Sequence, residues 1–259
     1  MQKLRAFAES LATGAGSILR EHHGKRHTIE YKGEIDLVTE VDRAAEAYMR
    51  ARIAEIYPDH EILGEEEGLK TSGSAYRWLL DPVDGTTNYA HGFPYYCVSV
   101  GLEHEGRVIV GAVYNPMLDE LFSAALGEGA TLNGTPIAVS ETTELRRSLL
   151  TTGFPYHVIQ EGSNLPLFIR FLYRCQAVRR AGSAALDLCH VACGRYDGFW
   201  EPGLSAWDVA AGSLIVQEAG GRMSDYQGNP FDPYAKELLA SNGPLHEAMM
   251  AVINEQNPD

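Results

Sequence analysis

Apolar residues recur at helical spacing in two stretches near the N-terminus. Between Leu4 and Leu19 they fall three or four positions apart and are interrupted by charged residues. This pattern predicts an amphipathic helix and lacks the continuous apolar stretch of a signal peptide. A second apolar stripe runs from Val41 to Ile56, and Pro58 would end that helix, so we expect it over residues 40–57.

Short apolar runs bounded by turn residues predict strands along the rest of the chain. A hairpin is expected over residues 96–114, with a turn that ends at Gly106. Further helices are expected over residues 183–193, 206–218 and 245–254. The other predicted strands cover residues 61–64, 77–80, 121–125, 137–139, 149–151, 176–178, 199–200 and 221–224.

This interleaving of strands and helices favours a layered α/β architecture, of the α/β or α+β class. No repeat or linker divides the chain, so we expect residues 1–259 to form a single unit. Its approximate halves are residues 1–140 and 141–259.

The charge balance limits the kinds of molecule that the protein can bind. The chain carries 21 Lys and Arg against 35 Asp and Glu, a formal net charge of −14. Direct binding to nucleic acid needs clustered cations, so none is expected. An anionic small molecule stays possible because a divalent metal can reverse the local field around carboxylates.

The cysteines and the hydropathy pattern give two further expectations. Cys97, Cys175, Cys189 and Cys193 form no CxxC pair, which favours buried thiols over a zinc site. No apolar run reaches membrane-spanning length, so we expect a cytoplasmic protein without a membrane anchor.

Candidate chemistry concentrates in the segment from Trp78 to Asn88, WLLDPVDGTTN. An apolar strand is expected to end at Asp81, and Asp84 lies three residues further on, before a Gly-Thr-Thr step suited to starting a helix. Two carboxylates beside a helix N-terminus could hold a metal and a phosphate together. The alternative is that Asp81 is a turn residue and Asp84 a plain N-cap.

Three other places bring acids near element ends. Glu65, Glu66 and Glu67 follow the strand predicted at residues 61–64 and could also be an exposed acidic loop. Asp208 stands at a helix start, seven residues after Glu201 at a strand end. Asp42 falls in a first helical turn, where a helix-dipole role is as reasonable as a functional one.

Taken together, these strings resemble the inositol monophosphatase family of metal-dependent, lithium-sensitive phosphatases. The matching strings are GEE at residues 64–66, WLLDPVDGTTN at 78–88 and WDVAAGSLIVQEAGG at 207–221, with a weaker match at 36–42. Glu67 departs from the family, which usually has a small polar residue there. The resemblance implies a five-layer αβαβα sandwich, a homodimer, and hydrolysis of inositol monophosphate to inositol and phosphate.

The resemblance also implies a site with two or three Mg²⁺ ions. One ion would be held by Glu65, Asp81 and the Val83 carbonyl, and a second by Asp81, Asp84 and Asp208. A third, weaker ion would use Glu65, near Asp42. Glu65 and Thr86 would polarise the attacking water. Phosphate would bind Gly85 and Thr86, and the alcohol would meet Ala184, Glu201 and Asp208.

These residue types suit metal-assisted hydrolysis of a phosphate ester. Hard oxygen ligands select Mg²⁺, and two metals can stabilise both ends of an in-line displacement on phosphorus. Several alternatives stay open: fructose 1,6-bisphosphatase or histidinol-phosphatase activity, dual specificity, or a regulatory binding protein on the same scaffold. Arg180 could meet a substrate phosphate or brace the loop before Gly182. No histidine is assigned a role.

Overall fold

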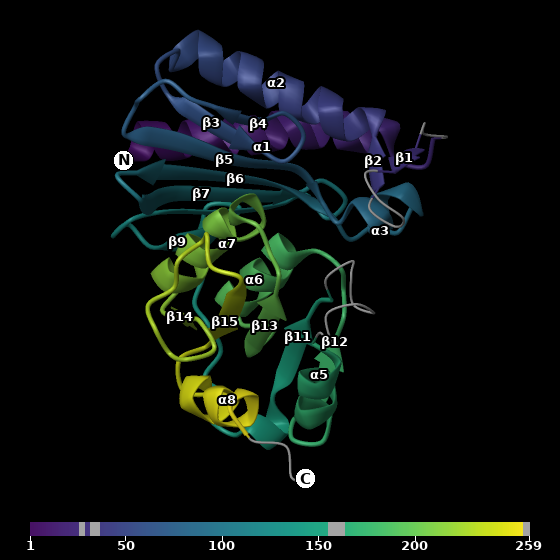
Figure 1. The fold of residues 1–259 in the computed structure, drawn as a ribbon, viewed down its shortest axis with the longest axis vertical. Helices are drawn as coiled ribbons and strands as arrows, with labels where there is room; N and C mark the ends of the chain where they lie inside the picture. Colours follow the sequence, from purple (N-terminus) through teal and green to yellow (C-terminus); the bar gives the residue numbers. More distant parts are fainter. Residues whose placement is uncertain (26–28, 32–36, 155–163, 256–259) are drawn as a thin grey trace.

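The computed structural model describes residues 1–25, 29–31, 37–154 and 164–255. Five layers alternate helices and sheets along the long axis of the molecule (Figure 1). This is the αβαβα order that the resemblance implies. Residues 32–36, which include Asp36 of the weaker N-terminal match, lie outside the described residues.

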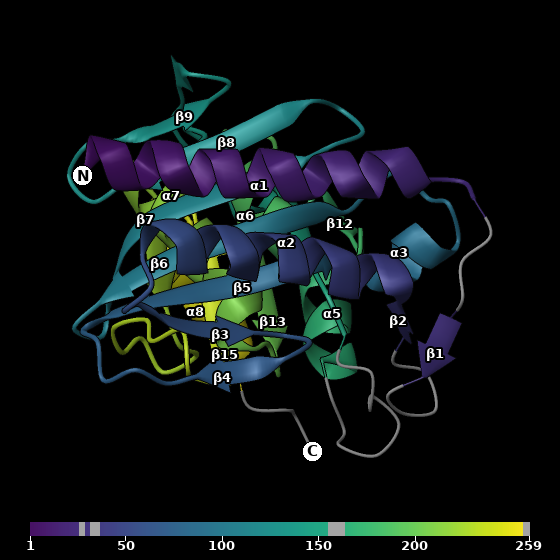
Figure 2. The same cartoon turned by 90° about the horizontal axis from the view of Figure 1, so that it is seen from above.

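Two long helices form the first layer. Helices α1 (Gln2–His22) and α2 (Glu40–Ile56) pack side by side on one face of the larger sheet (Figure 2). The buried side of α1 contains Ala8, Leu11, Ala15 and Leu19, which recur every three or four residues as the sequence predicts. Removing this apolar stripe from water attaches the helix to the sheet.

The larger sheet is mainly antiparallel. In spatial order its strands run β10-β9-β8-β7-β6-β5-β3-β4, and only β3 and β5 pair in parallel. The hairpin expected over residues 96–114 is confirmed as β6 and β7. The bounds are β3 (Glu61–Gly64), β4 (Gly68–Lys70), β5 (Tyr76–Asp84), β6 (Cys97–His104), β7 (Arg107–Asn115), β8 (Glu120–Ala125), β9 (Ala130–Leu132) and β10 (Thr135–Pro136).

The middle layer consists of α6 (Ala184–Ala192) and α7 (Ala206–Glu218). Helix α7 crosses the second face of the larger sheet, over β5, β6 and β7. Close approach depends on Gly111, where an added Cβ would lie 2.6 Å from the carbonyl oxygen of Ala211. The small residues of α7 therefore meet a sheet surface that also lacks side-chain bulk.

The smaller sheet lies beyond α6 and is covered by the last helical layer. Its spatial order is β12-β11-β13-β15-β14, with β12-β11-β13 parallel and β13-β15-β14 antiparallel. The outer helices are α5 (Leu165–Leu172) and α8 (His246–Ile253). The strand bounds are β11 (Leu149–Thr152), β12 (Ala177–Arg179), β13 (Gly198–Pro202), β14 (Arg222–Ser224) and β15 (Glu237–Ser241).

Four short elements complete the described chain. Strands β1 (Ile29–Tyr31) and β2 (Leu37–Thr39) pair with each other, and α3 (Thr86–Ala90) follows β5. A single 3₁₀ turn, η1, spans Leu145–Arg147. In the part of the chain that the structure describes, no helix is both long and apolar enough to cross a membrane.

The structure corrects one predicted strand. Residues 137–139 form no strand: the N–H of Ile137 still bonds the Ala130 carbonyl of β9, but the chain then leaves the sheet, and the N–H of Val139 bonds the carbonyl of Ala219, the residue after α7. The side chains of Ile137 and Val139 are partly buried against the core around α6 and α7. Strand β5 is also longer than predicted, since it continues through Pro82 to Asp84.

Candidate active site

A β-bulge in β5 brings two acids to one side of the sheet. Asp81 pairs with Ser99 and Asp84 with Cys97, so β5 advances three residues while β6 advances two. In a regular strand, residues three apart point to opposite faces, and the extra residue cancels that reversal. Pro82 sits inside the bulge, where its missing N–H interrupts no regular ladder. Asp81 and Asp84 therefore open into the same cleft.

The turn after the bulge positions Thr86. Gly85 has a φ of 100°, a left-handed conformation that favours glycine, and it caps α3. The Thr86 hydroxyl donates to the Val83 carbonyl at 2.9 Å and lies 3.4 Å from Oδ1 of Asp42. Thr86 thus begins α3 as predicted, and Asp42 of α2 reaches the same site.

The first residues of α6 hold Asp84 in place. Its carboxylate accepts hydrogen bonds from the Ser183 hydroxyl at 2.6 Å, the Ala185 N–H at 2.6 Å and the Ala184 N–H at 3.2 Å. Amides at a helix N-terminus favour an anion. Asp84 is therefore not the N-cap of the following helix; it joins the larger sheet to the second half of the chain.

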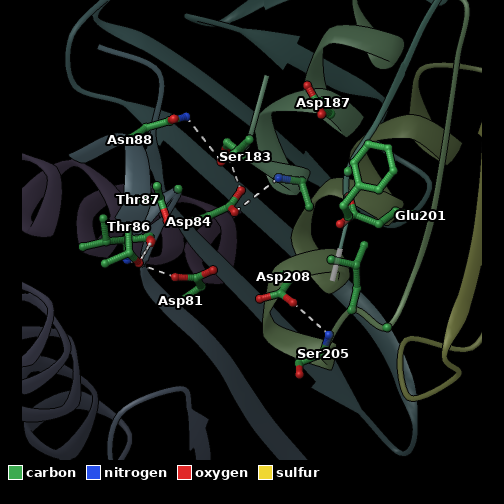
Figure 3. A pocket seen from close by; sticks show the side chains of 18 of the residues that line it. Asp81, Asp84, Thr86, Thr87, Asn88, Ser183, Asp187, Glu201, Ser205 and Asp208 are labelled. Atoms are coloured by element: carbon green, nitrogen blue, oxygen red, sulfur yellow. Dashed lines mark hydrogen bonds between the residues drawn. The ribbon is translucent and has the colours of Figure 1, made fainter. Parts of the chain in front are cut away.

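The second half contributes two more acids. Asp208 is the third residue of α7 and forms a capping box with Ser205, whose N–H donates to its Oδ2 at 2.8 Å. Glu201 lies near the end of β13 and is almost fully buried. Figure 3 shows both side chains across the cleft from Asp81 and Asp84.

All the site residues predicted from sequence line one cleft of about 340 Å³. Glu65 reaches it from the loop after β3, where its N–H bonds the carbonyl of Leu80. Segments far apart in the chain therefore meet as expected. The predicted residues in the lining are Glu65, Asp81, Val83, Asp84, Gly85, Thr86, Ala184, Glu201 and Asp208.

Burial and mutual repulsion raise the pKa of the acids in the cleft. The pKa of Asp81 is raised well above its usual value by burial and by the nearby Glu65, Asp84 and Asp208 carboxylates. Burial and Asp84 raise the pKa of Asp208 to about 7. Burial also raises the pKa of Asp84, despite its hydrogen bonds, and that of Glu201. Negative charge in this cleft is destabilised by the protein itself.

The donor set suits a hard divalent cation. Within the described residues, no recorded ion pair joins Asp81, Asp84 or Asp208 to Lys or Arg. Carboxylates and a carbonyl are the ligands that Mg²⁺ prefers. Among the described side chains, no three acids, histidines or cysteines are grouped closely enough to hold a metal ion as they stand.

Several cleft residues were not predicted from sequence. Ser183 caps α6 and bonds Asp84, and Asn88 ties α3 to the loop before α6 through the Ala181 carbonyl at 2.9 Å. Asp187 lines the cleft, accepts from the Tyr95 hydroxyl at 2.9 Å, and burial raises its pKa to about 8. Ser-Ala-Ala-Leu-Asp at 183–187 carries a signal for this, because a polar residue recurs one turn into an apolar helix.

The structure also places Arg180, Glu66 and the cysteines, whose roles the sequence did not decide. Arg180 is exposed, lies just after β12 and lines the cleft. Glu66 follows Glu65 and is half-buried. The four cysteines are free thiols, three of them buried, as the spacing predicts.

Comparison with known proteins identifies this arrangement. The profile of the inositol monophosphatase family matches residues 1–257. The inositol-1-monophosphatase of a Synechocystis species is 46% identical over 252 residues, covering 96% of this chain and 88% of that protein. The structure of an inositol monophosphatase from Anabaena has a TM-score of 0.89 and 43% identity, covering 97% of this chain and 95% of that one.

Two other relatives have names that point to different activities. The fructose-1,6-bisphosphatase/inositol-1-monophosphatase of Aquifex aeolicus is 41% identical, covering 97% of this chain and 96% of that protein. The Nus factor SuhB of Pseudomonas aeruginosa is 40% identical, covering 100% of this chain and 98% of that protein. With the profile match along nearly its whole length and the same layered fold, the chain belongs to the inositol monophosphatase family.

Proposed function

We propose that the protein is a Mg²⁺-dependent phosphomonoesterase that hydrolyses inositol monophosphate by direct attack of water. The observation that carries this proposal is the meeting of Glu65, Asp81, Asp84 and Asp208 in one cleft, where the described residues form no ion pair between Lys or Arg and Asp81, Asp84 or Asp208. The two halves of the chain would act as one catalytic unit, because each contributes acids to the cleft.

The carboxylates would hold the cation. Glu65, Asp81 and the Val83 carbonyl would bind one Mg²⁺, and Asp81, Asp84 and Asp208 a second. A weaker third ion would use Glu65. Bound Mg²⁺ would supply the Lewis acidity that lowers the pKa of water and neutralises charge on phosphate.

The remaining residues would orient water and substrate. Thr86 can accept from a water when its proton is donated to the Val83 carbonyl at 2.9 Å, so Thr86 and Glu65 would align the attacking oxygen. The N–H groups of Gly85 and Thr86, at the start of α3, would meet the phosphate. Ala184, Glu201 and Asp208 would contact the alcohol, on the side where the second half closes the cleft.

A second candidate substrate is fructose 1,6-bisphosphate. It is favoured by the Aquifex relative and by Arg180, which places a cation at the cleft. Histidinol phosphate fits the same reaction. The relative named as a Nus factor supports a different alternative, a regulatory binding role with or without catalysis.

Four further properties are proposed, of which the homodimer and the inhibition by Li⁺ rest on family resemblance. We propose a cytoplasmic homodimer that is inhibited by Li⁺ and that does not bind nucleic acid directly. The net charge of −14 supports the last of these.

The test is phosphate release with Mg²⁺ from inositol 1-phosphate, fructose 1,6-bisphosphate, 3′-phosphoadenosine 5′-phosphate and histidinol phosphate, compared as kcat/KM. We expect inositol 1-phosphate to give the highest value. A preference for another substrate would replace the proposed one. No hydrolysis of any of the four by Mg²⁺-bound protein would favour the binding role.

A further inference from the structure

Helix α2 presents a buried carboxylate to the loop that carries Glu65. The side chain of Glu46 is fully inaccessible to solvent. Its Oε2 accepts the N–H of Glu66 at 2.8 Å, and its Oε1 accepts the N–H of Glu67 at 3.0 Å. One carboxylate thus holds two successive amides of the acidic loop.

Arg50, one helical turn after Glu46, also contacts the loop at residues 65–68. The Nε of Arg50 lies 2.7 Å from Oε1 of Glu46, and its Nη2 donates to the Gly68 carbonyl at 2.5 Å. The guanidinium also lies 3.4 Å from a carboxylate oxygen of Glu67. Arg50 therefore neutralises Glu46 and closes the loop over residues 65–68.

The chain leaves no room for this carboxylate to move toward β3. A Cβ added at Gly64 would lie 2.3 Å from Oε1 of Glu46. Asp42, four residues before Glu46, reaches Thr86 from the same helix. Helix α2 thus presents one acid to each of two cleft segments that come from separate strands.

Burying a carboxylate costs free energy, so its position calls for an explanation. We propose that Glu46 is a positioning residue, which fixes the backbone of residues 65–67 so that the Glu65 carboxylate faces the cleft. This inference rests on the proposed function, because it takes Glu65 to be a ligand of Mg²⁺. Residues behind a metal ligand commonly change metal affinity by about 10- to 100-fold when replaced.

The chain contains a matched control at the other end of β3. Glu61 is also buried, accepts the N–H groups of Ser72 at 3.2 Å and Gly73 at 3.1 Å, and pairs with Arg77 at 2.8 Å. Like Glu46, it therefore accepts two successive backbone N–H groups and pairs with one arginine. Its loop, however, does not line the cleft among the described residues.

The experiment compares Glu46→Gln with Glu61→Gln in the full-length protein. Mg²⁺ affinity is measured by calorimetry on metal-stripped protein, and amide hydrogen exchange is followed at residues 66 and 67. We expect Glu46→Gln to weaken Mg²⁺ binding about tenfold and to accelerate exchange at both amides. Glu61→Gln should accelerate exchange at residues 72 and 73 and leave Mg²⁺ affinity unchanged.

Gly64→Ala gives a second route if Glu46→Gln folds poorly, since the new methyl group would displace the Glu46 carboxylate. Like Glu46→Gln, the Gly64→Ala variant should bind Mg²⁺ more weakly than wild type. Equal Mg²⁺ affinity in Glu46→Gln and wild type, with faster exchange at residues 66 and 67, would reduce Glu46 to a structural role.

Glu65→Gln separates this inference from the proposed function. If Glu65→Gln binds Mg²⁺ as tightly as wild type, Glu65 is not a ligand and the proposed metal site fails. If Glu65→Gln loses affinity while Glu46→Gln retains it, the metal site stands and the positioning role of Glu46 is wrong.

Discussion

Two groups of carboxylates in this protein have pKa values that are shifted in opposite directions. Glu61 and Glu120 each bond an arginine, Arg77 and Arg195, and that hydrogen bond lowers the pKa of each acid. Burial instead raises the pKa of Asp81, Asp84 and Asp208. The chain thus neutralises some acids internally, and leaves three in the cleft to be neutralised by a cation from outside.

The strongest test of this difference removes one acid from each group. Asp84→Asn should lower kcat for inositol 1-phosphate by at least about 10²- to 10³-fold, the size of effect found when one charge-stabilising group is lost. Glu120→Gln should change kcat little, because its partner Arg195 is at the surface. Initial rates and circular dichroism would be measured for both. Near wild-type turnover in folded Asp84→Asn would contradict the role of Asp84.

Arg180 is the one Lys or Arg among the described residues that line the cleft, and its replacement tests whether it reads the substrate. We expect Arg180→Gln to lower kcat/KM for fructose 1,6-bisphosphate about tenfold, or about 1.4 kcal/mol, and to affect inositol 1-phosphate less. The control is Arg179→Gln, since Arg179 is exposed and outside the cleft lining. An equal loss for both substrates would mean that Arg180 braces the loop before α6.

Repulsion among the cleft acids should also be visible in stability. In EDTA, Asp81→Asn should raise Tm by a few degrees, because about 1 kcal/mol corresponds to roughly 2–4 °C for a chain of this size. The amide oxygen can still accept the Val83 N–H that Asp81 accepts at 2.9 Å. Mg²⁺ should raise the Tm of wild type and not that of the variant. A lower Tm in EDTA, with an unchanged response to Mg²⁺, would contradict this reading.

His190 gives the smallest expected effect and lies beside the paired acid Glu120. Burial and Arg195 lower the pKa of His190 to about 4, and Tyr95 and Arg195 contact its two ring nitrogens. Between pH 6.5 and 4 the unfolded chain binds a proton that the folded protein does not. The unfolding free energy should therefore fall as pH falls, by up to about 1.4 kcal/mol per pH unit.

Denaturant unfolding at several pH values would check this, with His190→Gln losing part of the slope. The control variant is His91→Gln, since the His91 side chain is exposed. An identical slope in His190→Gln would show that His190 is not protonated on unfolding in this range.

The sequence predicted most of the longer helices and strands. Helix α7 was predicted with the bounds that the structure gives, and β3 likewise. Strand β15 was missed because Glu-Leu-Leu-Ala at 237–240 consists of good helix formers, and its strand form depends on pairing with β13 and β14. Helix α5 was missed because it spans only eight residues, most of them apolar, and a short apolar run cannot be told from a buried strand by its pattern.

The candidate site was predicted from local strings, and its supporting contacts were not. Strand-end acids and the Gly-Thr-Thr step signal their chemistry within a few residues. Glu46 belongs to no such string, and its contact with the loop at residues 65–67 depends on how α2 packs on the larger sheet. A charged residue on the buried face of an amphipathic helix was the only local sign, and the same sign marks Asp42.

The central claim is that the cleft acids work with a divalent cation, and one measurement tests it most directly. Phosphate release from inositol 1-phosphate would be followed with EDTA-stripped, dialysed protein as Mg²⁺ is added back. We predict no turnover above background without Mg²⁺ and a saturable rise as Mg²⁺ is restored. Full turnover in the stripped protein, with no response to added Mg²⁺, would contradict the account.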